Sequence, residues 1–165
     1  MGTAFKGSPA TLKGKLPAVG DKLADFSLVK ADLSAVTKQD YSGKTKIILT
    51  VPSLDTGVCA TETKRFNQEA AAIPGVEVLV VSRDLPFAQK RFCTAEGVDK
   101  VTTLSDLRDN GFAERYGVAL ADTPLAGLMA RAVIVAGPDD TVKYVELVPD
   151  ITQEPNYAAA LAAAK

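Results

Sequence analysis

The chain has 165 residues, of which 47% are hydrophobic and 24% are charged. This composition is typical of a folded globular protein, and it excludes a disordered or fibrous chain. Nineteen Lys and Arg residues against 20 Asp and Glu residues leave a net charge of −1, so the sequence offers no basic surface for nucleic acid or for an anionic membrane. Histidine is absent, which excludes Ser-His-Asp hydrolysis and histidine-ligated metal sites.

The chain has only two cysteines, Cys59 and Cys93. Two are too few for a zinc site or for the disulfide framework of a small secreted protein. No apolar run approaches the roughly 20 residues that span a bilayer, and the N-terminus lacks the apolar core of a secretory signal. We therefore expect a cytoplasmic protein without membrane contact. In that compartment the two cysteines are expected to be reactive or incidental rather than a permanent cross-link.

Apolar patterns and helix-breaking residues divide the first half of the chain. The continuous, largely β-branched run Lys46–Val51 predicts a buried strand that Pro52 ends. An apolar stripe at helical spacing then runs from Cys59 to Ile73, just before a Pro-Gly pair. In chain order we expect a hairpin over residues 3–16 that turns at 7–9, strands at 26–29, 35–37 and 46–51, and a helix at 59–72.

Strands and helices alternate in the second half. In chain order we expect a strand at 76–82, a helix at 87–94 opened by Pro86, a strand at 101–104, a helix at 110–116 closed by Gly117, a hairpin of strands 130–136 and 141–147, and a final helix at 155–165. Strands separated by single helices and followed by a hairpin predict an α/β fold whose sheet has parallel and antiparallel parts. No linker divides the chain, so we expect one domain over residues 1–165.

The most informative segment runs from Pro52 to Cys59 and reads Pro-Ser-Leu-Asp-Thr-Gly-Val-Cys. It places a cysteine in the first turn of a helix, where free backbone N–H groups and the helix dipole favour the reactive thiolate. Thr56 can cap this helix, and its hydroxyl can reach the same small volume. Taken alone, a cysteine that fills the core is the simpler interpretation.

This segment resembles the active-site loop of the peroxiredoxins, Pro-x-x-x-Thr-x-x-Cys after a buried strand, and more narrowly that of their thiol peroxidase subfamily. The likeness continues in the same order along nearly the whole chain. The further blocks are Asp84–Gln89, Arg91–Cys93, Ala95–Gly97, Tyr116–Ala119 and Pro124–Val133. The chain thus looks like a thiol peroxidase, an atypical two-cysteine peroxiredoxin.

The resemblance implies a thioredoxin-like fold, in which helices flank a central mixed β-sheet, with an N-terminal β-hairpin added. It makes Cys59 the peroxidatic cysteine and Cys93 the resolving cysteine, with Thr56 and Arg131 assisting Cys59. Pro52 matches the proline that shields the thiol from bulk water. The implied chemistry needs no metal and no organic cofactor.

The implied function is a thiol-dependent peroxidase for hydrogen peroxide and organic hydroperoxides. Cys59 would become a sulfenic acid, Cys93 would convert it to an intramolecular disulfide, and thioredoxin or a similar dithiol protein would reduce that disulfide. The family also implies a homodimer. The alternative is a non-enzymatic redox-sensing module that uses the same cysteine pair. A disulfide exchange enzyme is disfavoured, because Glu62 stands where a Cys-x-x-Cys partner would be.

Ordinary alternatives exist for the other site residues. Arg131, at the start of a predicted strand, could form a surface ion pair, and Cys93 could fill the core together with Phe87 and Phe92. Arg83 has no assignable role. If the two cysteines do pair, we expect the reduced protein to hold their sulfurs too far apart to bond. Oxidation would then unwind the helix start at residue 59 and the helix at 87–94.

Overall fold

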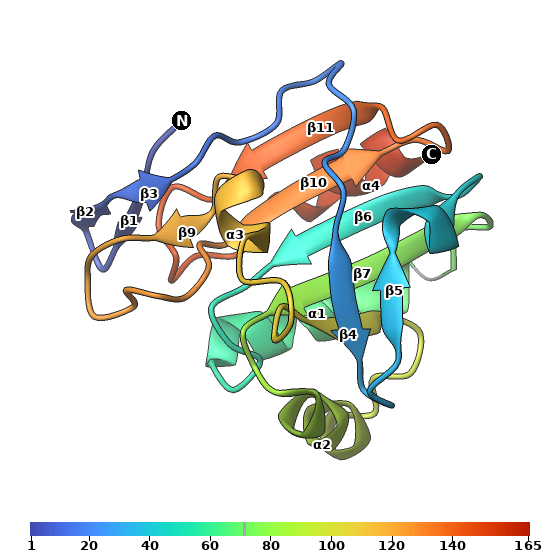
Figure 1. Cartoon of the computed structure of the whole chain (residues 1–165), viewed down its shortest axis with the longest axis horizontal. Coiled ribbons are helices and arrows are strands. Elements are labelled where there is room, and N and C mark those ends of the chain that lie inside the picture. The colour runs from blue at the N-terminus through green and yellow to red at the C-terminus, as the bar shows by residue number, and fades with distance from the viewer. Residues whose placement is uncertain (71) are drawn as a thin grey trace.

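A seven-stranded mixed β-sheet forms the centre of the protein (Figure 1). The computed structural model describes residues 1–70 and 72–165. The strands of this sheet are β4 (Ser27–Lys30), β5 (Ala35–Thr37), β6 (Thr45–Thr50), β7 (Val76–Ser82), β8 (Thr102–Ser105), β10 (Ala132–Ala136) and β11 (Val142–Leu147). They lie in the order β11-β10-β6-β7-β8-β4-β5. The predicted α/β class is confirmed.

The central strand β6 carries the pattern that predicted it. It pairs parallel with β7 and antiparallel with β10, so the sheet has both the parallel and the antiparallel part that we expected. Successive side chains of a strand point to opposite faces, and Ile47 and Leu49 pack into one apolar cluster while Ile48 packs into the other. All six residues of β6 are buried. A strand covered on both faces needs a continuous apolar run rather than an alternating one.

Helices cover the two faces of the sheet unequally. Figure 1 shows α1 and α4 behind the sheet and α3 in front of it. The helices are α1 (Gly57–Glu69), α2 (Pro86–Glu96), α3 (Phe112–Arg115) and α4 (Tyr157–Ala164). Phe66, Phe92 and Ala160 bring α1, α2 and α4 into the cluster on one face, whereas α3 packs Phe112 on the other. Within residues 1–70 and 72–165, no helix is long and apolar enough to cross a membrane.

The N-terminal hairpin is shorter than predicted. β1 (Thr3–Phe5) and β2 (Ser8–Ala10) pair antiparallel around a tight turn at Lys6 and Gly7, whose φ angles are 51° and 82°, so the turn lies earlier than the predicted 7–9. Two positive φ angles suit a two-residue hairpin turn, so the pairing ends at residue 10. The next segment, β3 (Leu12–Lys13), pairs instead with β9 (Ala119–Leu120). Its inclusion in the hairpin was wrong, because its partner lies more than a hundred residues away.

The helix ends differ from the predictions by a few residues. α1 begins at Gly57, two residues early, and ends at Glu69; Ala71, inside the predicted range, lies outside the described residues. α2 reaches Glu96 because Gly97, with φ of 67°, supplies the left-handed residue that closes it. α3 has only four residues, and a short 3-10 helix, η1 (Lys38–Tyr41), was not predicted.

Candidate active site

Cys59 lies where the loop after β6 enters α1. Pro52 follows the buried strand and has no N–H to continue a ladder, so the chain leaves the sheet there. After the loop of residues 53–56, Cys59 is the third residue of α1. Its side chain is 0% exposed and its thiol is free. The predicted placement of this cysteine, in the first turn of a helix that follows a buried strand, is confirmed.

Arg131 places its guanidinium against the Cys59 sulfur. Nη1 of Arg131 donates a hydrogen bond to Cys59 Sγ at 3.2 Å and another to Glu62 Oε2 at 2.7 Å. Nε donates to the carbonyl of Ile151 at 2.9 Å. The residue immediately precedes β10 and is 1% exposed, so the alternative of a surface ion pair is wrong. A buried cationic donor at this distance stabilises an anionic sulfur.

A pocket of about 190 Å³ opens beside Arg131, and Cys59 lies behind its lining, in contact with the guanidinium. Pro52, Thr56 and Arg131 line it together with apolar side chains such as Phe5 and Leu125. Since one water molecule takes about 30 Å³ of liquid volume, the pocket has room for a small hydroperoxide. Arg131 is the charged residue of its lining. The described part of the chain contains no group of three or more His, Cys, Asp or Glu residues that could hold a metal ion.

Thr56 occupies the N-cap position of α1 but does not cap it with its side chain. Its hydroxyl donates instead to the carbonyl of Ser53 at 3.0 Å, and its amide donates to the same carbonyl at 3.2 Å. The tight turn over residues 53–56 draws the hydroxyl backwards, which is why the expected cap does not form. The first amides of a helix have no acceptor within it. Those of Gly57 and Val58, whose residues line the pocket, are therefore free to bind an oxygen ligand.

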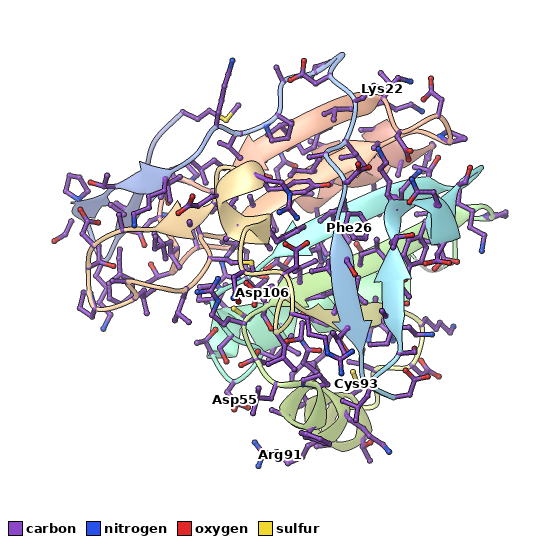
Figure 2. All side chains as sticks on the ribbon, in the orientation of Figure 1. Lys22, Phe26, Asp55, Arg91, Cys93 and Asp106 are labelled. Atoms are coloured by element: carbon purple, nitrogen blue, oxygen red, sulfur yellow. The ribbon has the colours of Figure 1, made fainter. Side chains whose placement is uncertain are left out.

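The structure does not bring Cys93 into this pocket. Cys93 is half-buried on α2, with its sulfur 3.9 Å from the Thr103 hydroxyl, and it lines a separate pocket of about 210 Å³ next to the end of β4 (Figure 2). Burial raises the pKa of this thiol, although the Thr103 contact lowers it. The predicted packing of Phe92 is confirmed, whereas Phe87 is 67% exposed near the start of α2 and belongs to neither apolar cluster.

Known proteins similar to this chain match it along almost its whole length. Residues 18–161 match the redoxin family. A thiol peroxidase of Leptospira interrogans is 56% identical over 162 residues, covering 97% of this chain and 95% of that protein. The thiol peroxidase of Halalkalibacterium halodurans is 51% identical over 161 residues, covering 98% and 95%. The chain belongs to the thiol peroxidases of the redoxin family.

A solved structure agrees with this assignment. The peroxiredoxin-like protein from Aquifex aeolicus superimposes with a TM-score of 0.92 at 45% identity, covering 98% of this chain and 94% of that one. The resemblance to peroxiredoxins and the thioredoxin-like fold are thereby confirmed. The chain is an enzyme, a thiol-dependent peroxidase, as the sequence predicted. Relatives named for this activity do not favour the alternative of a non-enzymatic redox sensor.

Arg83, which no motif explained, has a structural role in this thiol peroxidase. Its Nη2 donates to Asp106 Oδ2 at 2.7 Å, and its Nη1 donates to the carbonyl of Gly127 at 2.7 Å. Asp106 directly follows β8, whose end is buried beside that of β7. Arg83 therefore ties the ends of two parallel strands to the loop that leads into β10, and thereby supports the backbone that carries Arg131.

Glu62 belongs to the site, although it was not among the predicted site residues. It lies three residues after Cys59 on the same face of α1, it is 0% exposed, and one of its oxygens contacts Arg131. The other oxygen has no hydrogen-bond partner among the described residues. Burial raises the pKa of Glu62 to about 7, although Arg131 lowers it. The spacing of three residues on a helix was the available signal.

This shift predicts how Glu62 changes stability with pH. Between the ordinary glutamate pKa of 4.5 and about 7, the folded protein holds a proton that the unfolded chain has lost. The stabilisation of the folded state by the Glu62 carboxyl is therefore present in full below pH 4.5 and is lost as the pH rises through about 7. Glu62→Gln cannot ionise at this position. We therefore expect its free energy of unfolding, relative to that of the wild type, to increase as the pH rises from 5 to 8. Urea unfolding at both pH values measures the difference.

The matched control is Glu69→Gln, which removes an exposed carboxylate from the same helix. The difference in free energy of unfolding between this variant and the wild type is expected to stay nearly constant over this pH range. The raised pKa of Glu62 would be contradicted if the stability of Glu62→Gln relative to the wild type were also constant, or fell as the pH rises.

Proposed function

We propose that the chain reduces hydrogen peroxide and small organic hydroperoxides through a sulfenic acid at Cys59. The observation that carries this proposal is the contact of 3.2 Å between Cys59 Sγ and Nη1 of Arg131, a residue that also lines a small pocket. Such an arrangement provides a sulfur nucleophile, a fixed positive charge and space for a two-oxygen substrate. Pro52 and Thr56 complete the lining on the side of the loop.

In the first step, the Cys59 thiolate attacks the terminal oxygen of the peroxide. A sulfur electron pair forms the S–O bond, the O–O bond breaks, and the departing oxygen takes up a proton to leave as water or an alcohol. Negative charge thereby moves from the sulfur to the leaving oxygen. Donors that are already in place where this charge develops lower the barrier most. Arg131 and the free amides at the start of α1 are such donors.

The neighbours of Arg131 keep it suited to this task. Removal from water by itself lowers the pKa of the guanidinium, but Cys59 and Glu62 raise it, and the net effect is an increase. Arg131 therefore stays cationic throughout the cycle. Its Nε bond to Ile151 fixes the plane of the guanidinium, so that little reorganisation is needed when the peroxide binds.

Cys93 resolves the sulfenic acid in the second step. Its sulfur attacks Cys59 Sγ, the S–O bond breaks, and hydroxide leaves with the Cys93 proton as water. Because both thiols are free in this structure and contact different partners, at least one segment has to move first. Leaving its buried position also helps Cys93 to ionise, since burial is what raises its pKa.

Thioredoxin, or a dithiol protein like it, is the proposed reductant of the disulfide. It would attack one sulfur, form a mixed disulfide and then release the reduced enzyme. The proposal places the cycle in the cytoplasm, where such reductants keep thiols reduced. The homodimer that the family implies stays a prediction, which analytical ultracentrifugation of the reduced protein tests.

Cys93→Ala separates the two cysteine roles. We expect this variant to consume about one equivalent of peroxide and then stop, because the sulfenic acid at Cys59 forms but has no resolving partner. Dimedone labelling followed by mass spectrometry should place the adduct on Cys59. NADPH consumption coupled to thioredoxin and thioredoxin reductase should fall to the background rate.

The wild type is the reference in the same coupled assay, and it should turn over continuously with hydrogen peroxide. A redox sensor would react once and stop even with both cysteines present. Normal turnover of Cys93→Ala linked to thioredoxin would show that another group resolves the sulfenic acid.

A further inference from the structure

One carboxylate joins the Cys59 loop (residues 53–56) to the segment that leads into α2. Oδ1 of Asp84 accepts a hydrogen bond from the Ser53 hydroxyl at 2.7 Å. Oδ2 accepts from the Leu54 amide at 2.8 Å and from the Ser82 hydroxyl at 2.8 Å. Ser82 ends β7, and Asp84 lies two residues before α2 begins. The loop that precedes the Cys59 helix is therefore held by a residue at the start of the Cys93 helix.

The same network continues into α2. The Ser82 hydroxyl oxygen accepts a hydrogen bond from Gln89 Nε2 at 3.1 Å, and this nitrogen also donates to the carbonyl of Leu104 at 2.9 Å. Gln89 is fully buried and lies one helical turn before Cys93. A continuous series of hydrogen bonds thus runs from the Cys59 loop through Asp84 and Ser82 to the helix that carries Cys93.

Two ion pairs between the two regions are exposed. Lys64 and Glu96 join α1 to α2 at 2.9 Å, and Arg91 and Asp55 join α2 to the Cys59 loop at 3.7 Å, with all four side chains well exposed. Figure 2 shows Arg91 and Asp55 at the outer edge of the protein. Exposed ion pairs contribute little in water. The half-buried bonds to a carboxylate at Asp84 are of the stronger, charge-assisted kind.

We propose that Asp84 is a positioning residue that locks the two cysteine-bearing segments together and thereby sets the rate at which Cys93 reaches oxidised Cys59. The inference rests on the proposed pairing of these two cysteines. Because the Asp84 carboxylate bonds the loop directly and is connected to α2 through the Ser82 hydroxyl and Gln89, the loop and the start of α2 open together rather than independently. The lock keeps the peroxide pocket assembled, and it also delays formation of the disulfide.

The delay has a measurable consequence. While the sulfenic acid waits, a second peroxide molecule can oxidise Cys59 to the sulfinic acid, with transfer of one further oxygen to sulfur. The amount of sulfinic acid formed per turnover therefore reports how slowly Cys93 arrives. Asp84→Asn keeps the shape of the side chain, but it removes the charge and replaces one acceptor oxygen by an amide nitrogen that cannot accept. We expect disulfide formation about tenfold faster and sulfinic acid per turnover about tenfold lower.

The experiment mixes each reduced protein with peroxide in a quench-flow instrument and alkylates the remaining thiols. Mass spectrometry then counts the thiol, disulfide and sulfinic forms over time. Ser53→Ala removes a single bond of the lock, so it should change both quantities in the same direction by a smaller factor. Asp109→Asn is the matched control. Asp109 is also half-buried and bonds the Ser27 amide and Arg115, but it joins segments without a cysteine, so the sulfinic ratio should stay at the wild-type value.

The amount of sulfinic acid per turnover, called the sulfinic ratio, distinguishes a lock at Asp84 from a general contribution of this residue to stability. A general loss of stability would lower the urea midpoint of Asp84→Asn and Asp109→Asn alike and leave the ratio unchanged. Wild-type rates of disulfide formation in both Asp84→Asn and Ser53→Ala would overturn the inference while leaving the proposed function intact. A wild type that turns over peroxide without ever forming the Cys59–Cys93 disulfide would overturn both.

Discussion

Replacing Cys59 with serine is expected to abolish peroxide reduction, lowering the rate to that of peroxide in buffer. A serine hydroxyl stays protonated near neutral pH, and its oxygen cannot be oxidised as a sulfur is, so neither the attack nor the intermediate is available. Cys93 cannot take over. It contacts Thr103 rather than Arg131, and burial raises the pKa of its thiol.

The coupled assay with thioredoxin and thioredoxin reductase measures this loss. Serine is close in size to cysteine, so the variant should fold, and far-ultraviolet circular dichroism together with a urea midpoint checks that it does. Cys93→Ser serves as the partner variant, because it should still consume about one equivalent of peroxide. Sustained turnover by Cys59→Ser, even at a few per cent of the wild-type rate, would place the nucleophile elsewhere.

Removing the charge of Arg131 is expected to slow the oxidation of Cys59 by about 10²–10³-fold, the usual effect of losing one preorganised transition-state donor. Arg131→Met keeps much of the apolar stem while deleting the bonds to Cys59, Glu62 and Ile151. Breaking a buried ion pair leaves an unpaired charge and costs about 3–5 kcal/mol of stability. The substitution is therefore best made in a Glu62→Gln background, in which no carboxylate remains beside the vacated position.

Rapid mixing with peroxide, followed by quenching and counting of the remaining thiols, measures the rate of Cys59 oxidation directly, without the reductase steps. Glu62→Gln alone provides the reference for the double variant, and Arg108→Met controls for loss of a positive charge at an exposed position. The Arg108 variant should oxidise at the wild-type rate. If the double variant oxidises within a few-fold of Glu62→Gln, the guanidinium has no part in the chemistry.

The part of the site that the sequence predicted was encoded locally. A continuous apolar run, a proline and an apolar stripe at helical spacing follow one another between Lys46 and Ile73, and each is a signal that acts over a few residues. The structure has β6, the loop and α1 in those places. The roles of Cys59, Cys93 and Arg131 came from the family resemblance instead, and their chemical tests are the variants described above.

Local sequence patterns did not predict the contacts between segments that are far apart along the chain. The pairing of Leu12 with Leu120 depends on how the whole chain closes. The same holds for Arg131, whose position before a strand suited a surface ion pair equally well until its packing against α1 was known. Phe87 shows the opposite error, since an aromatic residue on a short helix suggested the core but lies on the side that faces solvent.

The sequence by itself determined the class of the fold, the order of its main elements and the placement of a cysteine at the start of a helix after a buried strand. These follow from propensities and periodicities that neighbouring residues share. Only the tertiary structure decided which groups lie beside that cysteine and hold its loop: the guanidinium of Arg131 with the buried carboxyl of Glu62, and the carboxylate of Asp84 that bonds the loop. The physical reason is that these interactions depend on distance in space and not on distance along the chain. Hydrogen bonds and burial act over a few ångströms in space, and the packed sheet brings together residues that are 31 and 72 positions apart along the chain.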